Sequence, residues 1–176
     1  MKKKKGSKKI ITIVMILLLL LVVWVCLSIA KSGRDEKPSP GPNGKWSVRI
    51  DDKSYQEAPG SLKAVGYNVS GTKMNYVVPL RQKGDFYQAT LTIVNDGDYD
   101  AKLDAVVIGG LTDEQKKVIK HTVSFGEYAF INNANNVSLY LDAGKSETIE
   151  ISILVNDEIT TDKDYTFEFT LNFVKD

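Results

Sequence analysis

Hydrophobic and polar positions follow two different patterns along this chain. Residues 10–30 are almost uniformly apolar and carry no charge over 21 positions. After residue 45, apolar and polar residues mostly alternate, in stretches separated by Gly, Asn and Asp. The first pattern predicts a transmembrane helix, because about 20 residues at ~1.5 Å each span the ~30 Å hydrocarbon core of a bilayer. The second predicts half-buried strands in antiparallel sheets.

Alternation is most regular in residues 74–80, 86–94, 148–155 and 165–174. Each of these stretches places one apolar set on a single face of a strand. Shorter strands are predicted at residues 46–50, 67–70, 121–125, 128–131 and 137–141. Pro79 has no N–H to donate, so the strand at 74–80 is expected at a sheet edge or to end near this residue.

Turn signals join these strands. Asn95-Asp96-Gly97-Asp98 separates the strand at 86–94 from an alternating stretch at 99–108. This arrangement predicts a β-hairpin, because Asn, Asp and Gly favour tight turns. The inward residues of its second strand would be Ala101, Leu103, Ala105 and Val107. A further turn is expected at residues 51–53, and a polar loop at 132–136.

One short helix interrupts the strand pattern. Thr112 and Gln115 have the spacing of a capping box, in which each side chain bonds the other residue's backbone N–H. This signature predicts a helix at about residues 113–120.

The predicted fold is therefore all-β: an antiparallel β-sandwich, immunoglobulin-like or jelly-roll, with one short helix and a single preceding transmembrane helix. Four regions follow. Residues 1–9 form a basic cytoplasmic head, 10–30 a transmembrane anchor or signal peptide, 31–45 a stalk rich in Pro and Gly, and 46–176 the extracytoplasmic domain.

Charge divides at the apolar run. Six lysines precede it, and all 22 acidic residues follow Ala30, where 17 basic residues leave a net charge of −5. Basic residues are retained on the cytoplasmic side, so the domain is expected outside the cell membrane, with a cytoplasmic N-terminus. An acidic domain disfavours nucleic acid as a partner.

A basic head followed by an apolar run is also typical of a signal peptide, and Ser28 and Ala30 fit cleavage after Ala30, which would give a secreted protein. The run exceeds the ~7–15 residues of a signal core, which favours an uncleaved anchor. Cys26, the only cysteine, lies inside the run, so the outer part has neither a disulfide nor a thiolate nucleophile.

The sequence offers few catalytic candidates. His121 is the only histidine, and a triad or a zinc site needs further partners, so we expect a packing or surface role for it. Hydrolase, metalloprotease and phosphate-loop motifs are missing from the sequence. We therefore expect a protein that is not an enzyme, with no catalytic residue and no cofactor.

Asp96, Asp98 and Asp100 are the calcium candidates, because carboxylates at alternate positions of a loop suit this ion. The loop does not fit an EF-hand: Ala101 stands at the Gly position and Val107 at the bidentate Glu position. We therefore expect a solvated turn and no metal site. The same holds for the second acidic loop, at residues 156–164.

Several segments together resemble a known family: WSVRI at 46–50, QKGD at 82–85, FYQATLTIVNDG followed by YDAKLDAVVI, and GKSETIEISI from 144. Over residues 46–174 the chain is similar to the TasA/camelysin-like surface proteins of Gram-positive bacteria. The resemblance implies an extracytoplasmic jelly-roll-like sandwich, export by a signal peptide and a role in biofilm matrix fibres. The metalloprotease activity attributed to some members would need a histidine-rich zinc site, which His121 alone does not provide.

These observations favour a non-enzymatic, membrane-anchored cell-surface protein with a structural or adhesive role. An exposed sheet edge, such as the strand at 74–80, would accept another strand and build fibres. The alternative is a ligand-binding or accessory subunit of a membrane complex, held near its partner by residues 10–30.

Overall fold

The computed structural model describes residues 41, 43–159 and 163–176. The chain divides into two compact units, Met1–Ser39 and Pro40–Asp176, and the second is the one described. The anchor expected at residues 10–30 and most of the stalk lie outside the described residues. In the described part, no helix has both the length and the apolar character needed to cross a membrane.

Ten strands and one short helix make up the described residues. They are β1 (Val48–Glu57), β2 (Gly66–Ser70), β3 (Lys73–Leu80), β4 (Phe86–Asn95), β5 (Ala101–Gly109), α2 (Asp113–Val118), β6 (Ile119–Phe125), β7 (Tyr128–Phe130), β8 (Ala134–Leu141), β9 (Ser146–Val155) and β10 (Lys163–Lys175). Two five-stranded sheets result, with strand orders β1-β4-β9-β6-β7 and β2-β3-β10-β5-β8. Every neighbouring pair is antiparallel, as predicted.

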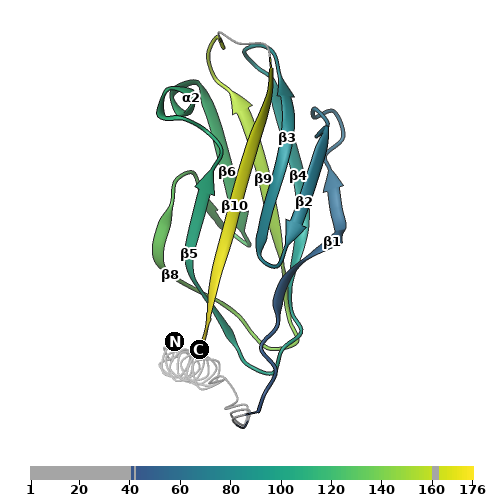
Figure 1. Cartoon of the computed structure of the whole chain (residues 1–176), viewed down its shortest axis with the longest axis vertical. Coiled ribbons are helices and arrows are strands. Elements are labelled where there is room, and N and C mark those ends of the chain that lie inside the picture. Colours follow the sequence, from purple (N-terminus) through teal and green to yellow (C-terminus); the bar gives the residue numbers. More distant parts are fainter. Residues whose placement is uncertain (1–40, 42, 160–162) are drawn as a thin grey trace, which may run out of the picture. The chain divides into compact units, whose positions relative to one another are not determined.

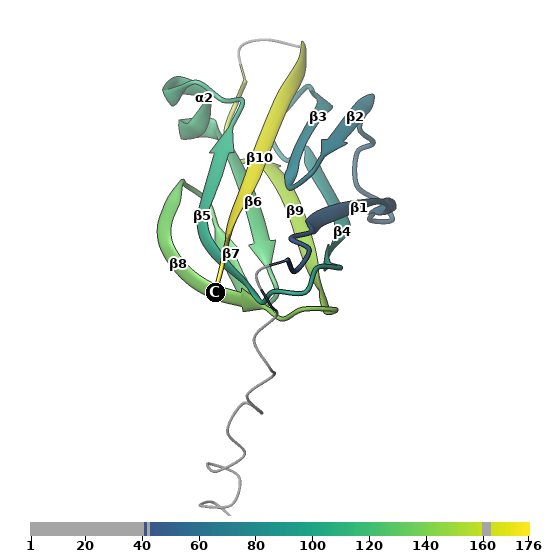
Figure 2. The same cartoon turned by 60° about the horizontal axis from the view of Figure 1, so that its bottom comes forward.

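The two sheets pack their apolar faces against each other around one core. Figure 2 shows β5, β10 and β3 lying across β6, β9 and β4. The core contains alternate residues of all six of these strands. The C-terminus lies at one end of the sheets, and α2 lies at the opposite end (Figure 1).

The alternating stretches point inward as the sequence predicts. Met74, Tyr76, Val78 and Leu80 of β3 are fully buried, and the apolar sets of β4, β9 and β10 lie in the same core. Thr112 and Gln115 form the predicted capping box: Thr112 Oγ1 accepts from Gln115 N, and Gln115 Oε1 accepts from Thr112 N at 2.8 Å. The helix ends at Val118, two residues before the predicted end, because β6 begins at Ile119.

The hairpin predicted across Asn95-Asp96-Gly97-Asp98 is wrong. β4 pairs with β1 and β9, whereas β5 pairs with β10 and β8 in the other sheet. The turn is a corner between the sheets, held by the buried side chain of Asn95, whose Nδ2 donates to the carbonyl oxygens of Tyr99 at 2.8 Å and Leu141 at 2.9 Å. Alternation identifies which face of a strand is buried, but not which strand lies beside it.

Two alternatives were predicted for the strand at 74–80, an edge position or an end near Pro79, and the second is confirmed: β3 ends at Leu80 and is not an edge strand. β3 lies between β2 and β10. Pro79 is tolerated because β2 begins at Gly66, opposite Val77, so the outer side of β3 has no pairing strand at Pro79.

Three local predictions fail where pairing is irregular. Val107 is exposed and Val106 is buried, because the pairing of β5 with β8 shifts register between Leu103 and Ala105. The turn predicted at 51–53 is instead an irregularity within β1, where the Oγ of Ser54 accepts from Thr92 N at 2.7 Å. The loop predicted at 132–136 ends early, because β8 begins at Ala134.

Candidate functional site

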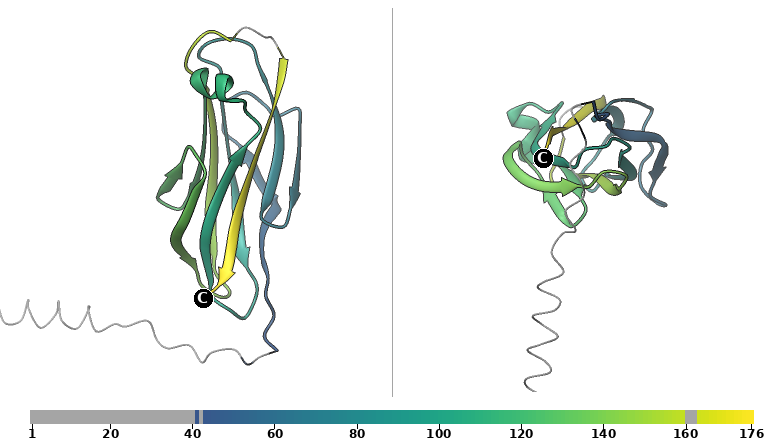
Figure 3. Two further views of the ribbon diagram at one scale, coloured as in Figure 1. Left: turned by 60° about the vertical axis from the view of Figure 1, so that its left-hand side comes forward. Right: turned by 90° about the horizontal axis from the view of Figure 1, so that it is seen from below.

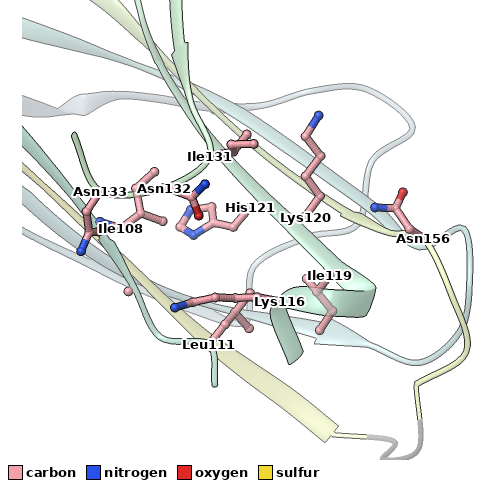
Figure 4. Close-up of a pocket in the computed structure, with 11 residues that line it drawn as sticks. Ile108, Leu111, Lys116, Ile119, Lys120, His121, Ile131, Asn132, Asn133 and Asn156 are labelled. Atoms are coloured by element: carbon pink, nitrogen blue, oxygen red, sulfur yellow. Dashed lines mark hydrogen bonds between the residues drawn. The ribbon is translucent and has the colours of Figure 1, made fainter. Parts of the chain in front are cut away.

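A pocket of about 510 Å³ lies at the end of the sheets that carries α2. Its apolar walls come from β5, β6 and their flanking loops, and its polar groups from α2, β6 and two loops (Figure 4). The lining residues are Ile108, Gly109, Leu111, Lys116, Ile119, Lys120, His121, Ile131, Asn132, Asn133 and Asn156. This volume suits a small molecule.

His121 is the most deeply buried polar group of this pocket. It follows Ile119 on the inward face of β6 and is 4% exposed. Its Nε2 lies 2.5 Å from the hydroxyl oxygen of Tyr76, which belongs to the opposite sheet. The ring meets Phe167 edge-on, at 5.2 Å between centroids. In Figure 4 the ring projects toward the middle of the lining side chains.

Burial sets the protonation of this pair. It lowers the pKa of His121 to about 4, so the imidazole is neutral at pH 7. Burial also raises the pKa of Tyr76 well above its usual value, so the phenol keeps its proton. The second ring nitrogen, Nδ1, is buried and has no hydrogen-bond partner among the described residues.

A second hollow, of about 590 Å³, lies between the open edges of the two sheets at β7 and β8. We call it the β7–β8 groove; its lining residues are Phe125, Gly126, Glu127, Tyr128, Leu139, Tyr140, Glu147 and Thr148. Tyr128 is 57% exposed and Tyr140 is 43% exposed. Figure 3 shows the β6–β7 hairpin and β8 side by side at this edge. The groove therefore presents two accessible aromatic rings beside two carboxylates.

The opposite side of the sheets, between β1 and β2, is closed by direct contacts. The rings of Tyr55 and Tyr67 are in tilted contact with centroids 4.2 Å apart, and Ile50 N donates to Gly71 O at 2.8 Å. The hydroxyl of Tyr55 bonds both Tyr87, at 2.8 Å, and Glu57, at 2.8 Å. Burial raises the pKa of Tyr87 to about 12, so these phenols keep their protons.

The three calcium candidates bind separate partners in the structure. Asp96 accepts from Ser47 and lies 3.5 Å from Arg49. Asp98 accepts from Lys45 N at 2.7 Å, and Asp100 accepts from Ala143 N at 2.7 Å. The hydrogen bond from Ser47 and the charges of Lys45 and Arg49 lower the pKa of Asp96. These contacts fasten the loop to β1 and to the turn before β9.

No group of three His, Cys, Asp or Glu side chains that would hold a metal ion occurs in residues 41, 43–159 and 163–176. In the second acidic loop, Asp157 pairs with Lys83 at 3.6 Å and Asp164 with Arg81 at 2.8 Å. These two carboxylates therefore bind cations of the neighbouring loop.

Sequence reasoning missed both hollows, because each is formed by segments far apart in the chain. One signal did mark His121: it shares the inward alternation of Val123 and Phe125, which predicts a buried side chain. Nothing in the order of residues indicated that Tyr128 and Tyr140 would line the same groove.

Comparisons with known proteins find no match for this chain among family models, curated proteins or solved structures.

Proposed function

We propose that this chain is a non-enzymatic cell-surface protein whose extracytoplasmic jelly-roll domain builds assemblies through the β7–β8 groove. The observation that carries the proposal is the contrast between the two sides of the sheets. The β1–β2 side is closed by a backbone hydrogen bond from Ile50 to Gly71 and by the contact of the Tyr55 and Tyr67 rings. The β7–β8 side leaves two strand edges open around Tyr128 and Tyr140.

The strand order supports a jelly roll over an immunoglobulin-like arrangement. Without the outer strands β1 and β2, the sheets read β4-β9-β6-β7 and β3-β10-β5-β8. From β3 onward every connection except that between β6 and β7 passes from one sheet to the other. Repeated crossing between two four-stranded sheets is typical of jelly rolls. This is also the fold that the resemblance to TasA/camelysin-like proteins implies.

An open strand edge binds an extended chain because its unpaired N–H and C=O groups accept another strand. β7 and β8 each have one neighbour only among the described strands. The exposed rings of Tyr128 and Tyr140 would cover side chains of the incoming strand. We propose a second copy of this chain as the partner, in accordance with a matrix or fibre role.

Residues 10–30 would hold the domain at the outer face of the cell membrane, or direct its secretion if cleaved after Ala30. The net charge of −5 beyond Ala30 supports solubility and disfavours nucleic acid.

The assembly is tested by sedimentation velocity of the full chain in a mild detergent over a wide concentration range. Concentration-dependent oligomers are expected for the natural chain. Tyr128→Lys should abolish them, because a charged side chain at a strand edge opposes pairing. Val65→Lys is the matched control: Val65 is also exposed, but it precedes β2 on the closed side and should not change assembly.

A chain that remains monomeric at every concentration would overturn this role, and so would equal loss of assembly in both variants. Intact-mass analysis of membrane and external fractions of the native source locates the protein. A full-length mass in the membrane indicates an anchor, and a mass starting at Lys31 outside the cell indicates a signal peptide.

A further inference from the structure

We propose that the pocket beside His121 is a binding site for a small organic carboxylate with an aliphatic chain. The inference goes beyond the proposed assembly role and does not depend on it, because the pocket and the β7–β8 groove share no lining residue.

The hydrogen bond between His121 and Tyr76 decides which nitrogen of His121 carries the proton. If Tyr76 donates its hydroxyl proton to Nε2, the proton of the neutral imidazole lies on Nδ1. If Nε2 donates to Tyr76 instead, the buried hydroxyl proton and the Nδ1 lone pair both lack partners in the described structure. The first arrangement leaves fewer buried polar groups unsatisfied, so it is favoured. His121, which lines the pocket, therefore has a buried Nδ1–H that lacks an acceptor among the described residues.

The charged side chains that line the pocket are cationic. Lys116 and Lys120 line it, and no acidic residue does. Asp113 pairs with Lys116 at 3.2 Å, but the Asp113 side chain is exposed and is not a lining residue of the pocket. The Oδ1 of Asn133 accepts from Ile108 N at 2.8 Å, which leaves the Asn133 amide N–H groups as donors. Ammonium and amide donors together favour an anion that accepts several hydrogen bonds.

The pocket also has an apolar wall. Ile108, Leu111, Ile119 and Ile131 line the same space. A carboxylate bound by the donors would place an aliphatic chain against these side chains, whereas an inorganic anion would leave them without contact. Free carboxylic acids and the C-terminus of a peptide share this chemistry.

His121 provides a specific probe, because it is the only histidine of the chain. Its two ring nitrogens give an unambiguous long-range proton–nitrogen NMR spectrum. The full chain in a mild non-ionic detergent is titrated with hexanoate, N-acetyl-Gly-Leu, hexan-1-ol and chloride. We expect the proton on Nδ1, and a saturable shift of that nitrogen with at least one of the two carboxylates. Binding of hexanoate alone indicates a free acid, and binding of the peptide alone indicates a chain end.

Two matched pairs of variants test the pocket. Lys116→Gln removes a lining charge, and Lys117→Gln removes a charge from the same helix outside the pocket. Asn133→Asp keeps the acceptor for Ile108 N but replaces the amide donors by a carboxylate, and Asn135→Asp adds the same charge outside the lining. Affinity for the carboxylate should fall at least about fivefold in Lys116→Gln and Asn133→Asp. The two control variants should stay within about twofold of the natural chain.

Three results would overturn the proposal. One is the lack of a saturable shift with either carboxylate. Another is binding of a control ligand as tight as that of the carboxylates. With hexan-1-ol, this would mean that the carboxylate group is not recognised. With chloride, it would mean that the aliphatic chain is not recognised. The third is the same loss of affinity in the controls as in the pocket variants. All four substituted side chains are exposed, so amide spectra should show an unchanged fold in every variant.

Discussion

Asn95 and His121 are the two buried polar side chains of the described residues, and each joins segments that the sequence keeps apart. Asn95 ties β4 to the start of β5 and to the end of β8 through its amide. His121 bonds Tyr76 across the interface between the sheets. A buried polar group without partners is destabilising, so the amide of Asn95 and the Nε2 of His121 each favour the arrangement that supplies these partners.

The first prediction concerns pH. His121 takes up a proton at about pH 4 in the folded state, against an ordinary pKa of 6.5 in the unfolded chain. The unfolded state therefore binds more protons between these values, and the free energy of unfolding falls as the pH drops. The contribution of neutral, buried His121 to the free energy of unfolding is fully present above pH 6.5. About 2 kcal/mol of it should be lost between pH 7 and pH 5, before most carboxylates titrate.

Urea unfolding at pH 7, 6 and 5 measures this dependence. His121→Gln lacks the titrating group and should show a much smaller change over the same range. A natural chain that is equally stable at pH 7 and pH 5 would contradict the buried neutral state of His121.

The second prediction concerns Asn95→Asp. The substitution removes both amide donors and places a carboxylate against the carbonyl oxygens of Tyr99 and Leu141. The free energy of unfolding at pH 7 should fall by roughly 3 kcal/mol or more, because the buried charge has no partner. Chemical denaturation measures the loss, with Asn68→Asp on the exposed face of β2 as the control. Equal stability of the two variants would mean that the corner does not depend on the amide.

At the scale of the elements, irregularities decide how strands fit together. The shifts of register in β1 and β5 break the simple alternation and change which side chains face the core. Irregular or short edge strands also limit uncontrolled pairing, and β7 has only three residues. A proposed docking edge that is this short would favour regulated assembly over indiscriminate aggregation.

The third prediction concerns Gly110, which connects β5 to the loop before α2. Its φ is +95°, and an added Cβ would overlap the carbonyl oxygen of Thr166 and lie 2.8 Å from Phe167 Cα in β10. Gly110→Ala should lower the free energy of unfolding by more than about 2 kcal/mol, since backbone strain and overlap add.

Gly60→Ala is the matched control. Gly60 also has a positive φ, of +79°, but an added Cβ would meet no atom within 4 Å. It should cost only about 1 kcal/mol, from the backbone conformation alone. Thermal unfolding compares the two variants, and equal losses would show that β10 does not approach Gly110 closely.

At the scale of the molecule, the pairing is long-range. β10 closes the second sheet by pairing with β3 on one side and β5 on the other, across many intervening residues. The whole core lies between Ile50 and Leu171. The domain therefore contains its own core and depends on contacts between residues that are far apart in the sequence.

The fourth prediction follows from that topology. A fragment of residues 41–176 should fold alone with the near-native far-UV spectrum of antiparallel sheet. Its refolding should take milliseconds to seconds, because closing long loops slows sheets of this kind. Stopped-flow refolding measures the rate. Refolding that is complete within microseconds would be inconsistent with this pattern of pairing.

The sequence predicted those features that depend on neighbouring residues. Alternation over 74–80, 86–94, 148–155 and 165–174 identified four strands and their buried faces. The pattern of Thr112 and Gln115 identified the helix. Both signals are local, since side-chain direction repeats every two residues in a strand and a cap involves one helical turn.

Only the tertiary structure decided which strands are neighbours and where the hollows lie. The turn at Asn95–Asp98 has the composition of a hairpin, yet the core separates its flanking strands into different sheets. The pocket beside His121 and the β7–β8 groove each combine segments that meet only after both sheets have formed. Packing of apolar faces is non-directional and long-range, so local residue patterns do not specify which faces meet.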